Sequence, residues 1–557
     1  MEGGERIWLG RTFADAVEEA AVRHASREAV VFQDQRLTFA ALAARVRDFA
    51  MGLAGLGIGK GDHVALWMSD CIEWVVARWA VPYIGAILVP VNTRLRGSDL
   101  AYILRQSDAC LLIMDQRFGE FSYLDVLETI VPGFPAQPAG AWQTPELPRL
   151  RAAIARGSGA GPALLDFASV EGQGRARLAV DIAALAGLRT AVRPEDIAQI
   201  VYTSGTTSLP KGAMVRHGPL LQNNFNSGRR VQVTEADAYL LSVPSFSASG
   251  VANHVGCLVH GAKLVLMERF SAEEFCRLAE RERASMAFFA DPLVYDLQRF
   301  PRRAEFDLSS LRTGSGGPLS QASFDFLCQE IGLGEMVHTY GMSETSNAVC
   351  RGNSRASFEE RRRSAGQPLP DIRVRIVDPA SGRELAQGEA GEICVGGYTV
   401  MAGYYDKPED TAAMIDGQGW LHTGDLGCFN GSGELVFMGR LKDVIKPGGF
   451  NVATSEIEEF LLTHPAVVQA AVIGLPDARL GEVPCAFIER RTGMVLAEAE
   501  LIDWCRRSIA SYKVPRHILF VSEWPLTGTH KIRKNRLKEM ASALLGERAP
   551  WSSGHRR

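Results

Sequence analysis

The stretch Tyr202-Thr203-Ser204-Gly205-Thr206-Thr207-Ser208-Leu209-Pro210-Lys211-Gly212 follows an apolar run, IAQIV, which is typical of a buried strand. Hydroxyl groups, a glycine and a lysine directly after a strand favour phosphate binding. Backbone N–H groups and hydroxyls donate hydrogen bonds to phosphate oxygens, and lysine offsets their charge. The spacing differs from the GxxxxGK(S/T) loop of P-loop enzymes. We therefore predict a phosphate-binding loop of another type, with a polar hairpin turn as the alternative.

Bulk properties describe an ordinary globular protein of more than one domain. A chain of 557 residues is too long for one compact core, and a formal net charge of −4 gives no reason to expect nucleic acid as a partner. None of the ten cysteines forms a C-x-x-C pair, which argues against a zinc site or a disulfide framework. The longest apolar window, 74–91, is interrupted by Arg78, Pro82 and Gly85, so we expect no membrane span. Unpaired thiols and the lack of a signal peptide at the N-terminus predict a cytoplasmic location.

Periodicity predicts alternating helices and strands on both sides of the loop. Before it we expect helices at 13–23, 39–56, 74–84 and 98–106 and strands at 62–68, 86–92 and 109–115. The segment 132–191 is rich in Pro, Gly and Ala, and we interpret it as a loose connection with one short helix at 150–156. After the loop, strands at 263–267 and 286–291 flank a helix at 272–282. The chain becomes strand-rich from about residue 392, and a smaller segment with its own helix at 455–463 follows Arg440.

Further motifs follow in a fixed order: Tyr340-Gly341-Met342-Ser343-Glu344-Thr345, then Trp420-Leu421-His422-Thr423-Gly424-Asp425, Gly439-Arg440-Leu441-Lys442-Asp443 and Pro525-Leu526-Thr527-Gly528-Thr529-His530-Lys531. Together with the loop, this series resembles the adenylate-forming superfamily of acyl-CoA synthetases, luciferases and adenylation domains, in its acyl-CoA ligase branch. The resemblance covers about residues 12–537.

The fold class that this resemblance implies is α/β. We expect a large N-terminal domain, 1–439, with parallel-rich sheets flanked by helices and a strand-rich subdomain. A small, mobile α+β domain, 440–557, would carry the hinge and a catalytic lysine.

The resemblance also assigns roles in nucleotide binding. The predicted nucleotide-binding residues are Ser204, Gly205, Thr206, Thr207, Lys211, Ser315, Gly316, Gly317, Tyr340, Gly341, Ser343, Asp425 and Arg440. The ring of Tyr340 would lie on adenine, and Asp425 and Arg440 would contact the ribose. Glu344 would hold Mg²⁺, which prefers oxygen ligands. The predicted catalytic residues are Thr203, Glu344 and Lys531; Lys531 would reach the carboxylate and the α-phosphate during adenylation.

The second half-reaction would use coenzyme A after the small domain rotates. Lys442 stands at the hinge position, and Lys446, Gly448 and Gly449 are the predicted CoA-binding residues. The predicted acyl-binding residues are Phe246, Ser247, Gly250 and Met342. Small residues at Ser247 and Gly250 predict room for a bulky acid.

Several positions depart from the family pattern. Ser208 replaces a glycine of the loop, Ser247 replaces a histidine or an aromatic residue, and His530 replaces the glycine before Lys531. The segment 311–319 is a residue or two shorter than its equivalent. Ser208 and His530 flank the adenylation machinery, so one alternative is an enzyme that only thioesterifies a preformed acyl-adenylate.

The function predicted from the sequence is an AMP-forming acyl-CoA ligase that uses a carboxylic acid, ATP, coenzyme A and Mg²⁺. A second alternative is a stand-alone adenylation enzyme that loads a carrier-protein thiol. A luciferase-like oxygenase and a non-catalytic nucleotide sensor are further hypotheses. A sensor would be expected to lack Lys531, Glu344 or Asp425, and all three are present. A homodimer is expected by resemblance.

Overall fold

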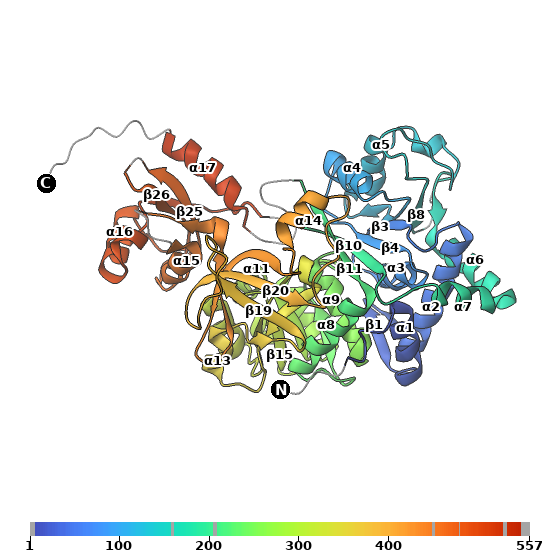
Figure 1. Ribbon diagram of the computed structural model, residues 1–557, viewed down its shortest axis with the longest axis horizontal. Coiled ribbons are helices and arrows are strands. Elements are labelled where there is room, and N and C mark those ends of the chain that lie inside the picture. The colour runs from blue at the N-terminus through green and yellow to red at the C-terminus, as the bar shows by residue number, and fades with distance from the viewer. Residues whose placement is uncertain are drawn as a thin grey trace.

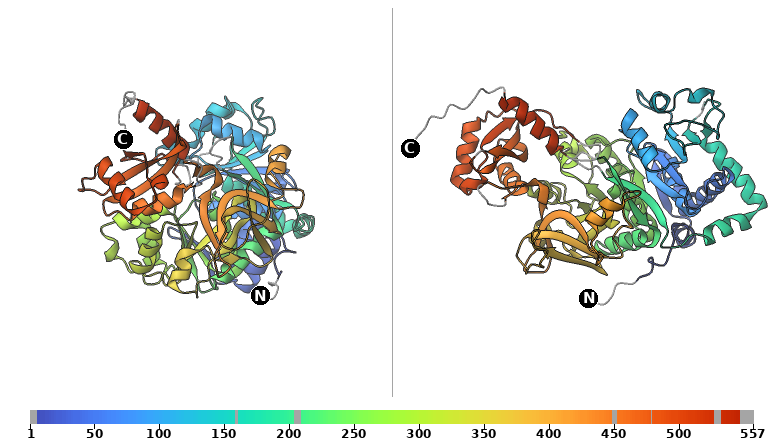
Figure 2. Two further views of the ribbon diagram at one scale, coloured as in Figure 1. Left: turned by 60° about the vertical axis from the view of Figure 1, so that its left-hand side comes forward. Right: turned by 45° about the horizontal axis from the view of Figure 1, so that its top comes forward.

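The structure is a computed structural model that describes residues 6–157, 161–203, 209–447, 452–477, 479–526 and 532–546. Two large sheets with helices around them form the body, and the C-terminal part of the chain forms a separate lobe (Figures 1 and 2). The described helices are α1 (Phe13–Arg23), α2 (Phe39–Gly55), α3 (Ile72–Tyr83), α4 (Gly97–Gln106), α5 (Tyr123–Ile130), α6 (Phe167–Val180), α7 (Ile182–Thr190), α8 (His217–Arg230), α9 (Ala248–His260), α10 (Ala272–Arg281), α11 (Asp291–Arg299), α12 (Gln321–Gln329), α13 (Phe358–Arg363), α14 (Pro408–Met414), α15 (Thr454–Leu462), α16 (Glu498–Ser508) and α17 (Lys534–Gly546).

The first large sheet has seven strands in the order β11–β10–β4–β3–β5–β8–β9. They are β3 (His63–Trp67), β4 (Ile87–Pro90), β5 (Leu111–Asp115), β8 (Ala152–Arg156), β9 (Leu165–Asp166), β10 (Ile197–Thr203) and β11 (Lys211–Arg216). The β10–β11 pair is antiparallel and the other pairs are parallel. β3 and β5 are buried along their whole length, as strands covered on both faces should be.

The second large sheet has nine strands in the order β18–β17–β16–β15–β14–β12–β13–β1–β2. They are β1 (Glu28–Phe32), β2 (Gln35–Thr38), β12 (Ala238–Leu241), β13 (Lys263–Leu266), β14 (Met286–Phe289), β15 (Thr313–Gly316), β16 (Val337–Met342), β17 (Asn347–Arg351) and β18 (Gln367–Pro368). Its central pairs, from β1–β13 to β15–β16, are parallel. Helix–strand alternation therefore produces parallel-rich sheets, and the predicted α/β class is confirmed.

The interpretation of 132–191 as a loose connection is wrong. Residues 152–156 form β8, which pairs in parallel with β5, and not the expected helix at 150–156. Helices α6 and α7 follow. The glycines of this region allow close helix packing: a Cβ atom on Gly174 of α6 would lie 1.7 Å from the carbonyl oxygen of Asp48 on α2. A composition rich in small residues is typical of loops, but in this segment it allows two helices to cross at close distance.

The strand-rich part and the final lobe follow the two sheets. An antiparallel four-stranded sheet contains β19 (Ile372–Val377), β20 (Gly391–Gly397), β21 (Leu421–Phe429) and β22 (Leu435–Arg440). The remaining described strands are β6 (Arg117–Phe118) and β7 (Phe121–Ser122) in a small hairpin, and β23 (Val444–Ile445), β24 (Val452–Ala453), β25 (Val467–Asp477), β26 (Gly481–Arg490) and β27 (His517–Phe520) in the lobe. None of the helices in the described ranges is apolar over a length that could cross a membrane.

Glu489 on β26 joins the final lobe to the body. One of its carboxylate oxygens accepts a hydrogen bond from the hydroxyl of Tyr295 on α11 at 2.6 Å and lies 3.4 Å from the guanidinium of Arg299. The other oxygen accepts from the indole N–H of Trp524 within the lobe, at 2.8 Å. The carboxylate therefore bridges the two parts of the chain.

Replacing Glu489 with alanine should loosen the docking of the lobe, because a hydrogen-bonded carboxylate contributes about 1.5–3 kcal/mol. We expect a larger radius of gyration by small-angle X-ray scattering and faster proteolysis near residue 440. Glu539→Ala is the matched control, since Glu539 lies in the same lobe and pairs only with exposed Arg536 among the contacts described. Unchanged scattering in Glu489→Ala would contradict a docking role.

Candidate active site

The predicted phosphate loop joins two paired strands. β10 ends at Thr203 and β11 begins at Lys211, and these two residues are register partners. The Thr203 hydroxyl donates to the Lys211 carbonyl oxygen at 3.4 Å. The Lys211 ammonium group contacts Asp410 on α14 and lies 5.5 Å from the centroid of the Tyr404 ring. The loop residues Ser204, Gly205, Thr206, Thr207 and Ser208 lie outside the described residues.

Glu344 is a buried carboxylate in the short 3-10 turn Ser343–Thr345 that follows β16. Its Oε1 atom accepts a hydrogen bond from the Tyr404 hydroxyl at 2.8 Å. Burial raises the pKa of Glu344, the nearby charge of Asp425 adds to this, and the Tyr404 hydroxyl and Arg440 oppose it. A buried carboxylate charge is costly unless it is paired, and metal binding at Glu344 stays a prediction.

Asp425 on β21 is held by two predicted site residues. Its Oδ2 atom accepts a hydrogen bond from the Tyr340 hydroxyl at 2.9 Å, and its Oδ1 atom lies 3.4 Å from Nε of Arg440. Arg440 is its register partner on β22, so strand pairing places the two charges together. Because β16 and β21 belong to different sheets, only the tertiary fold joins Tyr340 to Asp425.

The Tyr340 ring is a core side chain in this structure. Tyr340 is 2% exposed, and its ring lies 5.7 Å from that of Phe437, centroid to centroid. Burial and the charge of Asp425 raise the pKa of Tyr340. The contact with adenine stays a prediction.

The small residues around β15 and β16 have different surroundings. A Cβ atom on Gly341 would lie 1.7 Å from the carbonyl oxygen of Asn347, so glycine is required where β16 meets β17. Gly316 faces Leu319 and the backbone of Phe289, whereas Gly317 has open space at its Cβ position. Ser315 is buried at 6% exposure.

The predicted acyl-binding residues surround the start of α9. Ser247 caps this helix: its hydroxyl accepts from the Gly250 N–H at 3.0 Å and donates to the Pro244 carbonyl oxygen at 2.7 Å. A Cβ atom on Gly250 would lie 2.2 Å from that same carbonyl oxygen. The Cβ direction of Gly250 is therefore filled by backbone, and its role in making room for an acyl group stays a prediction. Phe246 is buried at 8% exposure, and Met342 ends β16.

The predicted hinge and CoA residues lie after β22. Lys442 occupies the 3-10 turn Leu441–Asp443, where partial burial and the charge of Arg440 lower the pKa of its ammonium group. Lys446 is exposed, and its backbone N–H donates to Glu482 at 2.9 Å. Gly448, Gly449, His530 and Lys531 lie outside the described residues.

Two residues that the sequence did not single out contact the predicted site. Tyr404 bonds Glu344, and Asp410 pairs with Lys211. Both come from the segment between β20 and β21, about 60 and 200 positions from their partners. The only local signal is the pair of tyrosines before Asp406-Lys407-Pro408, which does not indicate a partner.

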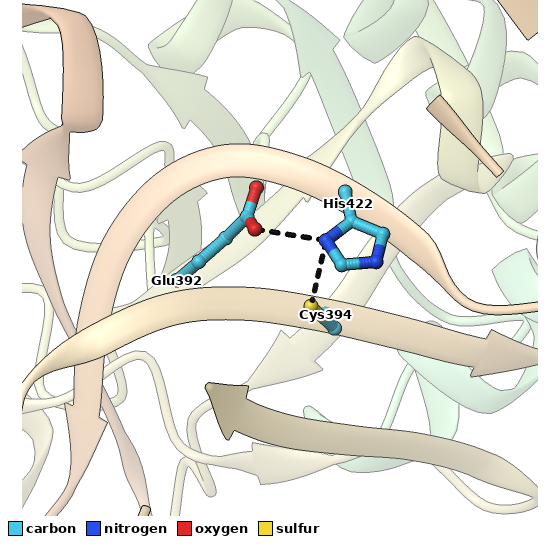
Figure 3. Close-up of side chains that lie close together, drawn as sticks. All are labelled: Glu392, Cys394 and His422. Atoms are coloured by element: carbon cyan, nitrogen blue, oxygen red, sulfur yellow. Dashed lines mark hydrogen bonds and ion pairs between the residues drawn. The ribbon is translucent and has the colours of Figure 1, made fainter. Parts of the chain in front are cut away.

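A Glu392–Cys394–His422 cluster lies on β20 and β21 (Figure 3). Nδ1 of His422 is 2.8 Å from Glu392 Oε2 and 3.5 Å from Cys394 Sγ, and Nε2 is 3.6 Å from Asp416. The second oxygen of Glu392 accepts from the Gly424 N–H at 3.0 Å. Burial raises the pKa of Cys394 to about 12, so the thiol is protonated and is a weak metal ligand. We assign the cluster to supporting the irregular stretch of β21 before Asp425, where its pairing register with β20 shifts.

A cavity of about 780 Å³ lies apart from the predicted nucleotide residues. It is an open hollow between β11 and the 397–419 segment, and Tyr404 is the site residue that it shares. None of the predicted nucleotide-binding residues in the described part of the chain lines this hollow.

Comparisons with known proteins agree with this geometry. The family model for "AMP-binding enzyme" matches residues 17–405, and that for "AMP-binding enzyme C-terminal domain" matches residues 456–531. A medium-chain acyl-CoA ligase of Homo sapiens, ACSF2, mitochondrial, is 31% identical, covering 95% of this chain and 87% of that protein. A propanoyl:CoA ligase of Rhodococcus jostii (strain RHA1), whose propanoyl chain carries a methyl-dioxo-octahydro-indenyl group, is 33% identical, covering 95% and 98%. The crystal structure of the anthranilate CoA ligase AuaEII with anthranoyl-AMP superposes with a TM-score of 0.84 at 26% identity, covering 97% and 98%.

Proposed function

The chain belongs to the AMP-binding enzyme family and is an AMP-forming acid–thiol ligase, and on this premise we propose that it joins a bulky carboxylic acid to coenzyme A through an acyl-AMP intermediate. The observation that carries the proposal is the meeting of Glu344, Asp425 and Arg440. These residues come from three motifs, and the charges of Asp425 and Arg440 both act on Glu344. Glu344 and Asp425 are buried, whereas the Arg440 side chain is exposed.

In the first half-reaction, the carboxylate of the acid would attack the α-phosphate of ATP and displace pyrophosphate, which leaves acyl-AMP. Asp425 and Arg440 would orient the ribose, and Lys211 with the loop hydroxyls would bind the phosphates. Glu344 suits Mg²⁺ because it is a buried carboxylate with one oxygen already bonded to Tyr404. When bound, Mg²⁺ would offset the charge of the phosphates. Lys211 would have to exchange Asp410 for phosphate.

In the second half-reaction, the thiol of coenzyme A would attack the acyl carbonyl carbon and release AMP. We place the boundary of the mobile domain between residues 439 and 440, with Lys442 at the hinge. The two family matches, at 17–405 and 456–531, lie on either side of this boundary. Lys446, Gly448 and Gly449 would bind coenzyme A.

A bulky acid is supported by the small Ser247 side chain and by the two-ring acid that the Rhodococcus jostii relative's name describes. Two alternative functions differ from this proposal in the half-reaction that the enzyme would catalyse. An enzyme hindered by Ser208 and His530 would only thioesterify a supplied acyl-adenylate. A stand-alone adenylation enzyme would pass the acyl group to a carrier-protein thiol.

A panel of carboxylic acids scored in two ways tests the proposal. Each acid is assayed with ATP, Mg²⁺ and coenzyme A, and its synthetic acyl-AMP is assayed with coenzyme A alone. We expect thioester in both assays for the cognate acids, together with acid-dependent ATP–pyrophosphate exchange. Thioester from acyl-AMP without any exchange would overturn the adenylation step, and exchange without thioester would overturn coenzyme A as the acceptor.

A further inference from the structure

A closed cavity of about 50 Å³ lies behind the predicted site, between helices α8 and α9 and the strands of the nine-stranded sheet. Ser315 and Asn347 line its side nearest the nucleotide motifs, and Thr339 directly precedes Tyr340. Tyr239 on β12, Asn253 on α9 and Arg351 on β17 complete the polar part of the wall. The cavity is thus continuous with the elements that carry the proposed chemistry.

Four side chains of this wall each hold a buried polar atom that has no hydrogen-bond partner in the described structure. They are Oη of Tyr239, Nδ2 of Asn253, Oγ1 of Thr339 and Nε of Arg351. Ser315 and Asn253 lie beside the Tyr239 hydroxyl without completing a bond to it. Native proteins rarely leave such atoms unpaired, because each one costs folding free energy. Four around a single space indicate a binding site for a polar group.

The charge of the wall is positive. Arg351 is 8% exposed, and its Nη1 atom donates to the carbonyl oxygen and hydroxyl of Ser227 at 3.2 and 2.7 Å. It forms no ion pair with a carboxylate among the described residues. Burial lowers the pKa of Arg351 to about 10, so the guanidinium still carries its charge at neutral pH. A buried cation without a counter-ion favours a ligand atom that is negative or partly negative.

The hydrogen-bonding groups of the cavity wall also favour a ligand atom that is negative or partly negative. The free N–H groups of Asn253 and Arg351 can only donate hydrogen bonds, and the hydroxyls of Tyr239 and Thr339 can donate or accept. The group that satisfies all four must therefore accept hydrogen bonds. The volume, about 50 Å³, is enough for a small group of a few atoms. A terminal polar group would fit this space and the donors around it.

We propose that the acid activated by this enzyme carries a second oxygen acceptor, a ketone or a second carboxylate, remote from its reacting carboxyl group, and that Tyr239, Asn253, Thr339 and Arg351 bind it. This inference rests on the proposed function and names its substrate class. The binding energy of the second oxygen would fix the acid in the pocket while the first carboxylate reacts. A hydrocarbon end would leave the four polar atoms unpaired, and the site would reject it.

The test compares acids of equal length that end in a methyl group, a ketone or a carboxylate, with chains and rings of several sizes. We expect kcat/KM with ATP and coenzyme A to favour an oxygen-bearing acid over its hydrocarbon counterpart at least about 10-fold. The ketone and carboxylate arms show which oxygen is preferred. Tyr239→Phe should reduce the preference about 10-fold. This variant should fold, since the hydroxyl that it removes has no partner.

Tyr83→Phe is the matched control. The Tyr83 hydroxyl donates to Glu18 at 2.7 Å, between α3 and α1, and the variant should keep the full preference. Thr339→Val is a second variant expected to lose it. Equal kcat/KM for oxygen-bearing and hydrocarbon acids, or an unchanged preference in both cavity variants, overturns the inference and means that water alone fills the cavity. No thioester from any acid counts instead against the proposed ligase function.

Discussion

Lys531→Ala is expected to slow acyl-adenylate formation about 100- to 1,000-fold while sparing thioester formation from supplied acyl-AMP. The reason is electrostatic: the proposed role of Lys531 is to meet the charge that develops between carboxylate and α-phosphate, and removing one such group costs about this much. ATP–pyrophosphate exchange measures the first step, and acyl-AMP plus coenzyme A measures the second.

Arg536→Ala provides the control for a general effect of positive charge. Arg536 lies five positions further along the chain, is exposed, and pairs with Glu539 on α17. Its removal should leave both half-reactions unchanged. If Lys531→Ala behaved in the same way, Lys531 would be one more solvated residue of the basic segment that follows it, and its catalytic assignment would be wrong.

Glu344→Gln is expected to lower adenylation about 100-fold and to raise the Mg²⁺ concentration needed for half-maximal rate. Glutamine keeps the shape and still accepts the Tyr404 hydrogen bond, but it removes the charge that would hold the metal. Initial rates of pyrophosphate exchange over a Mg²⁺ series would measure both effects. Tyr404→Phe keeps the carboxylate and should have a smaller effect. An unchanged Mg²⁺ dependence in Glu344→Gln would refute the metal role.

The same substitution should raise stability at neutral pH. Burial raises the pKa of Glu344 above that of the unfolded chain. At pH values above the pKa of this glutamate in the unfolded chain, the unfolded state therefore releases the proton more readily than the folded state. The buried charge of the folded state then lowers the free energy of unfolding. The gain in free energy of unfolding from Glu344→Gln should be absent at low pH and should grow as the pH rises through the raised pKa. Denaturant unfolding at several pH values would show it. Lower activity with higher stability is typical of a residue kept for function.

Local patterns predicted most of the regular structure near the nucleotide motifs. The helix at 13–23 begins and ends where its periodicity predicts, because Thr12 and Asp15 form a reciprocal cap at its start. The prediction for the segment 132–191 is wrong for a physical reason. Its Pro, Gly and Ala content is typical of a loose connection, yet Gly174 allows α6 to lie directly against the backbone of α2. A sequence does not distinguish glycine needed for a turn from glycine needed for close packing.

The sequence by itself determined the family and the order of its motifs, since loop, turn and strand signals are short-range and survive without knowledge of the fold. Only the tertiary structure decided which side chains meet. Tyr340 bonds Asp425 across two sheets, Tyr404 bonds Glu344 from a loop distant in the chain, and the Cβ position of Gly250 faces the Pro244 backbone. The polar cavity behind Ser315 is likewise assembled from α8, α9 and five strands. Such contacts depend on strand order and helix packing, which bring together residues far apart in the chain and which no local pattern encodes.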